Sequence, residues 1–216
     1  VYQTRLEIDQ EFDVAIRTPL SMILASPRFL FMKEYGEDGA PRVLNQLELA
    51  VRLSYFLWSS PPDSQLLDLA RAKRLSDPAV LRGQVDRMIQ DLRAHHFVSG
   101  LAHQWLDMER LDFFQFNVAR HREFDESTRA AAREEVYQTI FHLLRSKDQG
   151  QLQHLLKSDY VVVNGLMAAH YGLGGVVGDH YRKVSLPENS PRGGFLGMAA
   201  IHAMGSDGIE SSPVER

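Results

Sequence analysis

Apolar residues recur at helical spacing along most of this chain, and that period restricts the fold to one built from helices. The clearest run covers 47–58. It follows Asn45 and Glu48, whose spacing is that of a capping box, and Pro61 ends it. Because the run is apolar on nearly all sides, we expect its helix to lie at the centre of the bundle.

The rest of the chain follows the same pattern. A stripe that begins near Ser127 predicts the longest helix, to about residue 146. After residue 150 the predicted helices shorten and glycines accumulate. Only 160–163 and 180–184 look extended, and both are too short for a sheet of any size. We therefore expect an all-α fold, an irregular helical bundle with a Gly-rich, loop-rich C-terminal third.

Composition excludes several classes of function. The chain has 216 residues, 44% of them hydrophobic, which is enough for a core without staples. Its formal net charge of −4 predicts no binding to nucleic acid. The absence of Cys excludes disulfides, thiolate metal sites and covalent C-x-x-C-H haem within this stretch. No apolar run reaches the ~20 residues of a membrane span.

The familiar catalytic motifs are missing from the sequence. It has no Walker A motif, no H-E-x-x-H, no G-x-S-x-G, and no Glu-x-x-His of the kind that diiron bundles use. The glycine cluster at 171–178 does not lie between a strand and a helix, so it indicates a loop rather than a dinucleotide site. The pairs Glu134/Glu135 and Asp207/Glu210 are the candidate carboxylates for a hydrolase.

Four residues are predicted to have structural roles. Trp58 and Trp105 should fill the core, the latter as part of a helical stripe that also contains Phe97 and Leu101. Arg52 interrupts the most apolar helix, and a buried guanidinium needs a carboxylate partner. Asp63, or Asp68 in the same following helix, could supply it.

The C-terminal third contains the candidate binding residues. His170, Arg192 and His202 are predicted to hold a ligand or partner, since binding groups concentrate on loops of a rigid scaffold. Asp207 and Glu210 offer oxygens to a hard cation such as Ca²⁺. The alternative is that this stretch is a linker into a following domain.

Six segments, taken together and in order, resemble one family: the multidomain planctomycete-type proteins that combine cytochrome-c-like modules with planctomycete-specific domains of unknown function. The matching segments are 26–31, 48–70, 104–111, 133–141, 159–173 and 192–216. The resemblance implies a helical planctomycete-specific domain over 1–185 and the start of a following domain over 192–216. The chain begins at Val1 without Met and stops at Arg216, and we expect both ends to be cut.

The resemblance also implies an extracytoplasmic, periplasmic protein with haem c in another part of the polypeptide. We therefore expect a helical accessory domain that supports electron transfer or oxidative chemistry centred outside this chain, with the cytochrome-c-like domain of the same polypeptide as its partner. A non-catalytic envelope scaffold or interaction module is one alternative, and a hydrolase acting on polysaccharide is another. Whether the chain is an enzyme stays open, and no catalytic residue is assigned.

Overall fold

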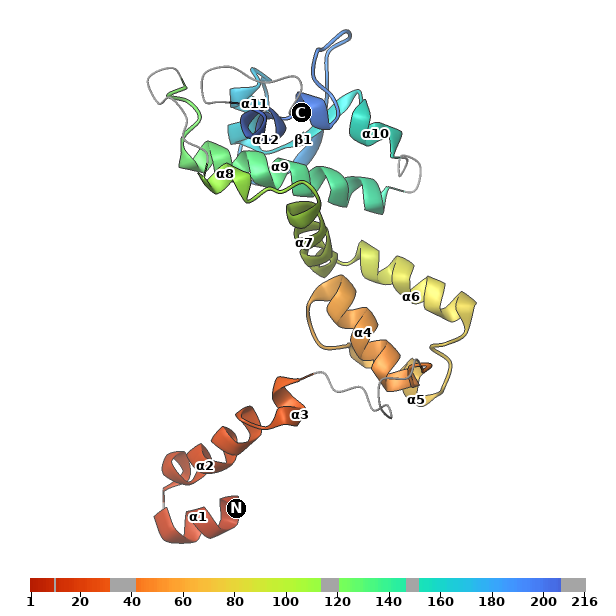
Figure 1. Cartoon of the computed structure of the whole chain (residues 1–216), viewed down its shortest axis with the longest axis vertical. Helices are drawn as coiled ribbons and strands as arrows, with labels where there is room; N and C mark the ends of the chain where they lie inside the picture. Colours follow the sequence, from red (N-terminus) through yellow and green to blue (C-terminus); the bar gives the residue numbers. More distant parts are fainter. Residues whose placement is uncertain (10, 32–41, 114–120, 147–151, 207–216) are drawn as a thin grey trace. The chain divides into compact units, whose positions relative to one another are not determined.

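The computed structural model is mostly helical, as the periodicity predicted (Figure 1). It describes the chain except residues 10, 32–41, 114–120, 147–151 and 207–216. The chain divides into two units, Val1–Glu48 and Leu49–Arg216. We describe each unit separately.

The first unit is a helical hairpin followed by the start of a longer helix. Helix α1 (Tyr2–Asp9) packs on α2 (Phe12–Leu24), and the short α3 (Pro27–Leu30) follows. The capping box is confirmed at the start of α4 (Gln46–Trp58). Asn45 Oδ1 accepts the backbone N–H of Glu48 at 3.0 Å, and the Glu48 carboxylate accepts that of Asn45 at 2.9 Å.

The second unit begins with helices around the side chain of Trp58. Those that contact Trp58 are α6 (Pro78–Gln90) and the 3-10 turn η1 (Leu92–Ala94). This unit also contains α5 (Ser64–Arg71), α7 (His95–Trp105) and α8 (Arg110–Phe113). Trp58 is 1% exposed, and its indole N–H donates to the carbonyl of Met88 at 3.0 Å. The guanidinium of Arg93 lies 3.5 Å from the indole centroid, so Trp58 is confirmed as a core residue.

Helix α9 (Glu126–Arg145) organises the second unit. It is the longest helix in the described part of the chain, as its stripe predicted, and Asp125 caps it by accepting the N–H of Thr128. Figure 1 shows it running beneath α11 (Gly165–His170), α12 (Ala199–Met204) and the sheet. Helix α7 also packs on it. The central position expected for the 47–58 helix therefore belongs to α9.

That expectation was wrong because α4 is apolar on two faces but buried on one. Ala50, Leu57 and Trp58 are buried, whereas Leu47 is 50% exposed and Phe56 is 63% exposed. An apolar side chain at the surface is common in folded proteins, so apolarity on all sides of a helix does not by itself require burial.

A small sheet modifies the all-α expectation. After α10 (Gln153–Leu156), strand β1 (Tyr160–Val163) pairs antiparallel with β2 (Arg182–Ser185). The register places Tyr160 opposite Ser185 and Val162 opposite Lys183. All four residues of β1 are buried against α9. The fold is therefore mostly helical with one two-stranded ribbon.

The residues after β2 return to the same core. The 3-10 turn η2 (Phe195–Gly197) and α12 contribute buried side chains beside those of α9, namely Phe195, Met198, Ala200, Ala203 and Met204. The predicted start of a following domain at residue 192 stays a prediction, and the described part of that segment packs on α9.

Two adjacent glycines make this return possible. Gly193 and Gly194 have φ values of +116° and +75°, which L side chains rarely adopt. A Cβ at Gly193 would lie 2.1 Å from the carbonyl oxygen of Ser158, and one at Gly194 would lie 2.3 Å from that of Leu156. The two glycines therefore allow the backbone to pass directly against the turn that precedes β1.

One structural prediction for a single residue was wrong. Trp105 is 60% exposed, because the buried face of α7 is formed by Val98 and Ala102, one turn apart. Small residues on this face let α7 approach α9 closely. Arg52 lies on the exposed side of α4, and its structural ion pair stays a prediction.

The carboxylates proposed as partners of Arg52 bind other cations. Asp63 caps α5 and forms an ion pair with Arg87 at 2.7 Å, whereas Asp68 pairs with Arg71 at 3.0 Å. Asp63 therefore has a structural role, as predicted, but it acts through α6.

The Asn164 cap offers a local test of the segment between β1 and α11. Asn164 Oδ1 accepts the N–H of Met167 at 2.9 Å, and the residue is buried. Asn164→Ala should lower the free energy of unfolding by ~1–2 kcal/mol in urea denaturation, because the N–H loses its acceptor. Asn164→Ser keeps an acceptor oxygen and should recover most of the loss. Equal losses in the two variants would contradict the capping role.

Candidate functional site

A pocket of 710 Å³ lies in the second unit where α9 faces β2 and the turn between α6 and α7. Its size is that of a small-molecule site. None of the described residues that line it is acidic. They are Gln90, Leu92, His95, His96, Gln138, Phe141, His142, Arg145, Ser146, Val162, Tyr181, Arg182 and Lys183.

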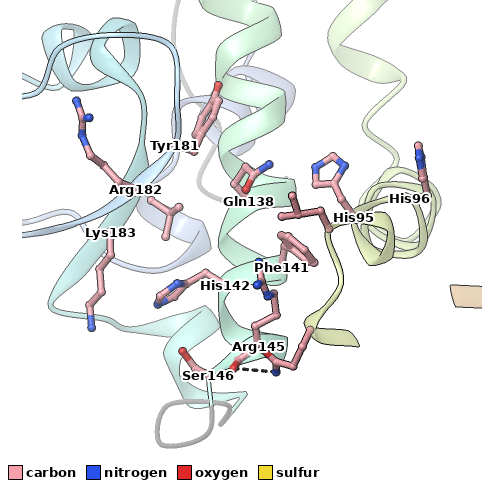
Figure 2. Close-up of a pocket in the computed structure, with 13 residues that line it drawn as sticks. His95, His96, Gln138, Phe141, His142, Arg145, Ser146, Tyr181, Arg182 and Lys183 are labelled. Atoms are coloured by element: carbon pink, nitrogen blue, oxygen red, sulfur yellow. Dashed lines mark hydrogen bonds between the residues drawn. The ribbon is translucent and has the colours of Figure 1, made fainter. Parts of the chain in front are cut away.

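Helix period and strand register bring the polar groups together. His142 and Arg145 are three residues apart on α9, so they lie on one helix face. Lys183 comes from β2, which pairs with β1 beside α9. In the view of Figure 2, His142 lies between Lys183 and Arg145. His95, at the start of α7, also lines the pocket.

The electrostatics of the pocket are those of an anion site. Burial, and then the charges of Lys183 and Arg145, lower the pKa of His142, so its imidazole is neutral at pH 7. His95 behaves in the opposite way, because its hydrogen bond to Glu134 at 2.8 Å raises its pKa. The charged residues of the lining are cationic, so the local charge is opposite in sign to the chain's net charge of −4.

All three cations have local contacts, and Lys183 Nζ lies 4.2 Å from the ring centroid of Tyr160. The Arg182 guanidinium donates to the carbonyl of Val177 at 2.5 Å and contacts His180. That of Arg145 lies 4.9 Å from the ring centroid of Phe141. The contact with Phe141 fixes the stem of Arg145 and leaves the N–H groups at the edge of its planar head able to donate to an anion.

The residues that the sequence predicted to bind a ligand form a different cluster. Arg192 lies over the ring of Tyr171, 4.0 Å from its centroid, and donates to the carbonyl of Gly197 at 3.3 Å. Burial, and then the charge of Arg192, lower the pKa of His170, whose ring contacts Phe124. His170 and Arg192 therefore act on one another, but neither lines the pocket of Figure 2.

His202, the third predicted binding residue, contacts the same turn that Arg192 contacts. The His202 imidazole is 2.6 Å from the carbonyl oxygen of Leu196, which is next to the carbonyl that Arg192 holds. Together the two side chains fix η2. Asp207 and Glu210, the predicted cation ligands, lie outside the described residues.

Glu135 is the residue whose role sequence reasoning missed. It is fully buried in α9, and its Oε2 accepts the hydroxyl proton of Tyr171 at 2.5 Å. The Tyr171 oxygen accepts the N–H of Ala199 at 2.8 Å. Burial raises the pKa of Glu135 to about 8, although the Tyr171 hydrogen bond and Arg192 oppose it. The sequence does contain one signal of its burial. Glu135 is next to Val136, which belongs to the apolar stripe of the predicted longest helix.

Metal binding and membrane insertion receive no support from the described residues. Among them, no group of three or more His, Asp or Glu could hold a metal ion. The helices that the structure describes include none with the length and apolar character needed to cross a bilayer.

One comparison with known proteins gave a match. The model of the family PSD4, described as a protein of unknown function (DUF1592), matches residues 44–173. That range contains α9, β1 and the α6–α7 turn, but not β2. No curated protein and no solved structure matches the chain.

Proposed function

Since the chain belongs to the PSD4 family, whose function is unknown, we propose its function from its own surface. We propose a helical accessory domain of a planctomycete-type, haem c-associated periplasmic protein. Through the cationic pocket on α9 it docks the cytochrome-c-like domain of the same polypeptide, and so supports electron transfer or oxidative chemistry centred there.

The single observation that supports this proposal is the sign of charge in the pocket. Arg145, Arg182 and Lys183 gather there, and no carboxylate is among the lining residues that the structure describes, in a chain that is acidic overall. Complementary charge steers association and fixes orientation. A haem c carries two propionate carboxylates, so a cytochrome-c-like partner presents the anionic groups that such a pocket fits.

The chain's own composition supports a redox centre in the partner rather than in this chain. It has no Cys to attach a haem covalently. We expect the chain purified alone to show no Soret absorbance after gel filtration. A Soret band that stays with the chain would contradict this, and would direct attention to His170 and His202.

Both alternatives remain hypotheses. An envelope scaffold would use the same surface without redox chemistry. For a polysaccharide hydrolase, the carboxylate pair would be Glu134 and Glu135, of which Glu134 pairs with His95 and Glu135 has no exposed surface. Neither carboxylate is therefore placed to act on a polysaccharide, and the charge of the pocket favours docking.

Charge reversal in the pocket tests the docking proposal. The chain is titrated into the purified cytochrome-c-like domain of its own polypeptide and followed by calorimetry at two salt concentrations. Arg145→Glu/Lys183→Glu should weaken binding by at least about tenfold and remove most of its salt dependence.

The matched control carries the same charge change away from the pocket. Arg82→Glu/Lys73→Glu alters two exposed cations of α6 and the preceding turn, neither of which lines the pocket. It should keep the affinity within about twofold of the parent chain. Equal weakening by both double variants, or by neither, would refute docking at this pocket.

A further inference from the structure

Two polar groups in the interior of the second unit depend on one another: the carboxyl of Glu135 in α9 and the hydroxyl of Tyr171 at the end of α11. The carboxyl is fully buried, and its Oε2 accepts the tyrosine proton at 2.5 Å. Its Oε1 has no hydrogen-bond partner among the described residues. An ionised carboxylate here would be a buried charge with one donor, which costs its hydration with little in return. The surroundings therefore favour the protonated acid.

The same hydroxyl also holds the segment that follows β2. Its oxygen accepts the backbone N–H of Ala199, the first residue of α12, at 2.8 Å. The guanidinium of Arg192 lies over the Tyr171 ring, 4.0 Å from its centroid. We call residues 192–204 the closing segment. It rests on the tyrosine whose proton the Glu135 carboxyl accepts.

The closing segment is the part of these surroundings that can move away. Opening has to break the contact of Ala199 with Tyr171 and the hydrogen bond from the Gly194 N–H to Ser158 Oγ at 3.1 Å. Hydrogen bonds within the segment hold η2 and α12, so both elements can leave as one piece. Helix α9, by contrast, is packed by α7, α11 and β1 as well. Folded chains commonly open through one contiguous piece of this kind.

The other charged groups around Glu135 have partners of their own. The charge of Arg192 acts on the carboxyl and opposes the effect of burial. Tyr181 also senses Glu135, but its hydroxyl donates to the Ala131 carbonyl. The groups on the elements packed against α9 contact other residues: His95 with Glu134, His103 with Tyr137, Asp112 with Arg133, Arg87 with Asp63, His170 with Phe124, His202 with the Leu196 carbonyl, and Tyr160 with His142. The hydrogen bonds that an ionised Glu135 lacks therefore have to come from water.

We propose that Glu135 and Tyr171 form a proton-dependent latch, which holds the closing segment on α9 while the carboxyl is protonated and releases it when the carboxyl ionises. In the open form water reaches the carboxylate. Opening also uncovers Phe195 and Met198, which are buried in the closed form. The latch goes beyond the proposed docking, because neither Glu135 nor Tyr171 lines the pocket.

The sign of the pH effect follows from burial, which raises the pKa of Glu135 from 4.5 to about 8 in the closed form. In the open form water restores the ordinary pKa. The closed form thus keeps a proton that the open form releases, so closure is favoured at low pH and is lost as the pH rises. The equilibrium constant for opening should increase about tenfold per pH unit from pH 5 to 8, and should level off above that range.

Amide hydrogen exchange, followed by NMR on the whole chain, measures this opening. After correction for the intrinsic exchange rate, the protection of the Ala199 amide should fall about tenfold per pH unit between pH 5 and 8. A low urea concentration should leave this exchange unchanged but accelerate that of the β1 amides, because sensitivity to urea scales with the surface exposed. Equal rates and equal urea dependence at Ala199 and in β1 would reduce the effect to global unfolding and overturn the latch.

Three variants test the residues of the latch. Glu135→Gln keeps an acceptor for Tyr171 but has no proton to lose, so the protection of Ala199 should lose most of its pH dependence. Glu134→Gln makes the same change at the neighbouring position and, as the matched control, should keep the parent's slope. Tyr171→Phe keeps the ring under Arg192 but removes the hydroxyl, and it should lower the protection of Ala199 about tenfold at pH 5.

Each other result decides against the latch. A pH slope that survives in Glu135→Gln, a slope lost equally in Glu134→Gln, or unchanged protection of Ala199 in Tyr171→Phe would each overturn it. Because no partner domain enters these measurements, docking can fail while the latch stands, and the latch can fail while docking stands.

Discussion

Replacing Glu135 with glutamine is expected to remove most of the pH dependence of unfolding between pH 5 and 8. Glu135 is buried in α9 with one hydrogen bond, from Tyr171. Glutamine keeps the length of the side chain and an oxygen that can accept that bond. It has no proton to lose, so the variant carries no titration at this position.

The sign follows from the pKa of Glu135, which burial raises from 4.5 to about 8. The folded chain therefore holds a proton that the unfolded chain releases. The stability that this proton gives is fully present below pH 4.5 and is lost as the pH rises to about 8, on the order of 5 kcal/mol in total. Above pH 8 we expect Glu135→Gln to be more stable than the parent chain.

Chemical denaturation at half-unit steps of pH measures this difference. The variant is compared with the parent because the histidines also make unfolding depend on pH, equally in both chains. As the pH rises, the contribution of His95 to the free energy of unfolding falls, whereas the contributions of His142 and His170 increase. Glu126→Gln, an exposed position of the same helix, is the control and should follow the parent. Parallel curves for Glu135→Gln and the parent from pH 5 to 8 would contradict a buried, protonated Glu135.

The two tryptophans are expected to differ greatly when each is truncated to alanine. Trp58→Ala should lower the free energy of unfolding by ~3–5 kcal/mol, because it opens a cavity and leaves the Met88 carbonyl and Arg93 without the indole. Trp105→Ala should cost less than about 1 kcal/mol, since Trp105 is 60% exposed and contacts Phe195 by an edge.

Urea denaturation followed by far-ultraviolet circular dichroism compares the two variants without relying on indole fluorescence. Each serves as the control for the other, because the residue removed is the same. Similar losses at both positions would mean that α7 buries the face with Phe97 and Trp105, as the sequence stripe predicted, rather than the face with Val98 and Ala102.

That stripe shows where sequence reasoning fails in this fold. The capping box at Asn45 is a local signal, because side chain and backbone lie within three residues, and the structure confirms it. The choice of buried face is not local. On α7 the larger residues predicted one face, but close packing against α9 favours the small ones at Val98 and Ala102.

The pocket was out of reach for a similar reason. Its cations come from α9 and β2, whereas His95 comes from the start of α7. These elements are far apart in the sequence, so no spacing pattern links their residues. By contrast, His170 and Arg192, which the sequence groups in the C-terminal third, do act on one another. The description of that third as Gly-rich and loop-rich, and its role as a ligand site, stay predictions.

The late position of Arg192 and Ala199 has a consequence for synthesis. Glu135 and Tyr171 leave the ribosome before the residues that complete their surroundings, and the passage of the backbone through Gly193 and Gly194 comes between. A nascent chain that ends at residue 173, where the family match ends, lacks Arg192 and Ala199. It would have to bury the Glu135 carboxyl and the Tyr171 hydroxyl without the contacts that these two residues make with Tyr171. The second unit should therefore stay open on this side until α12 has emerged from the ribosome.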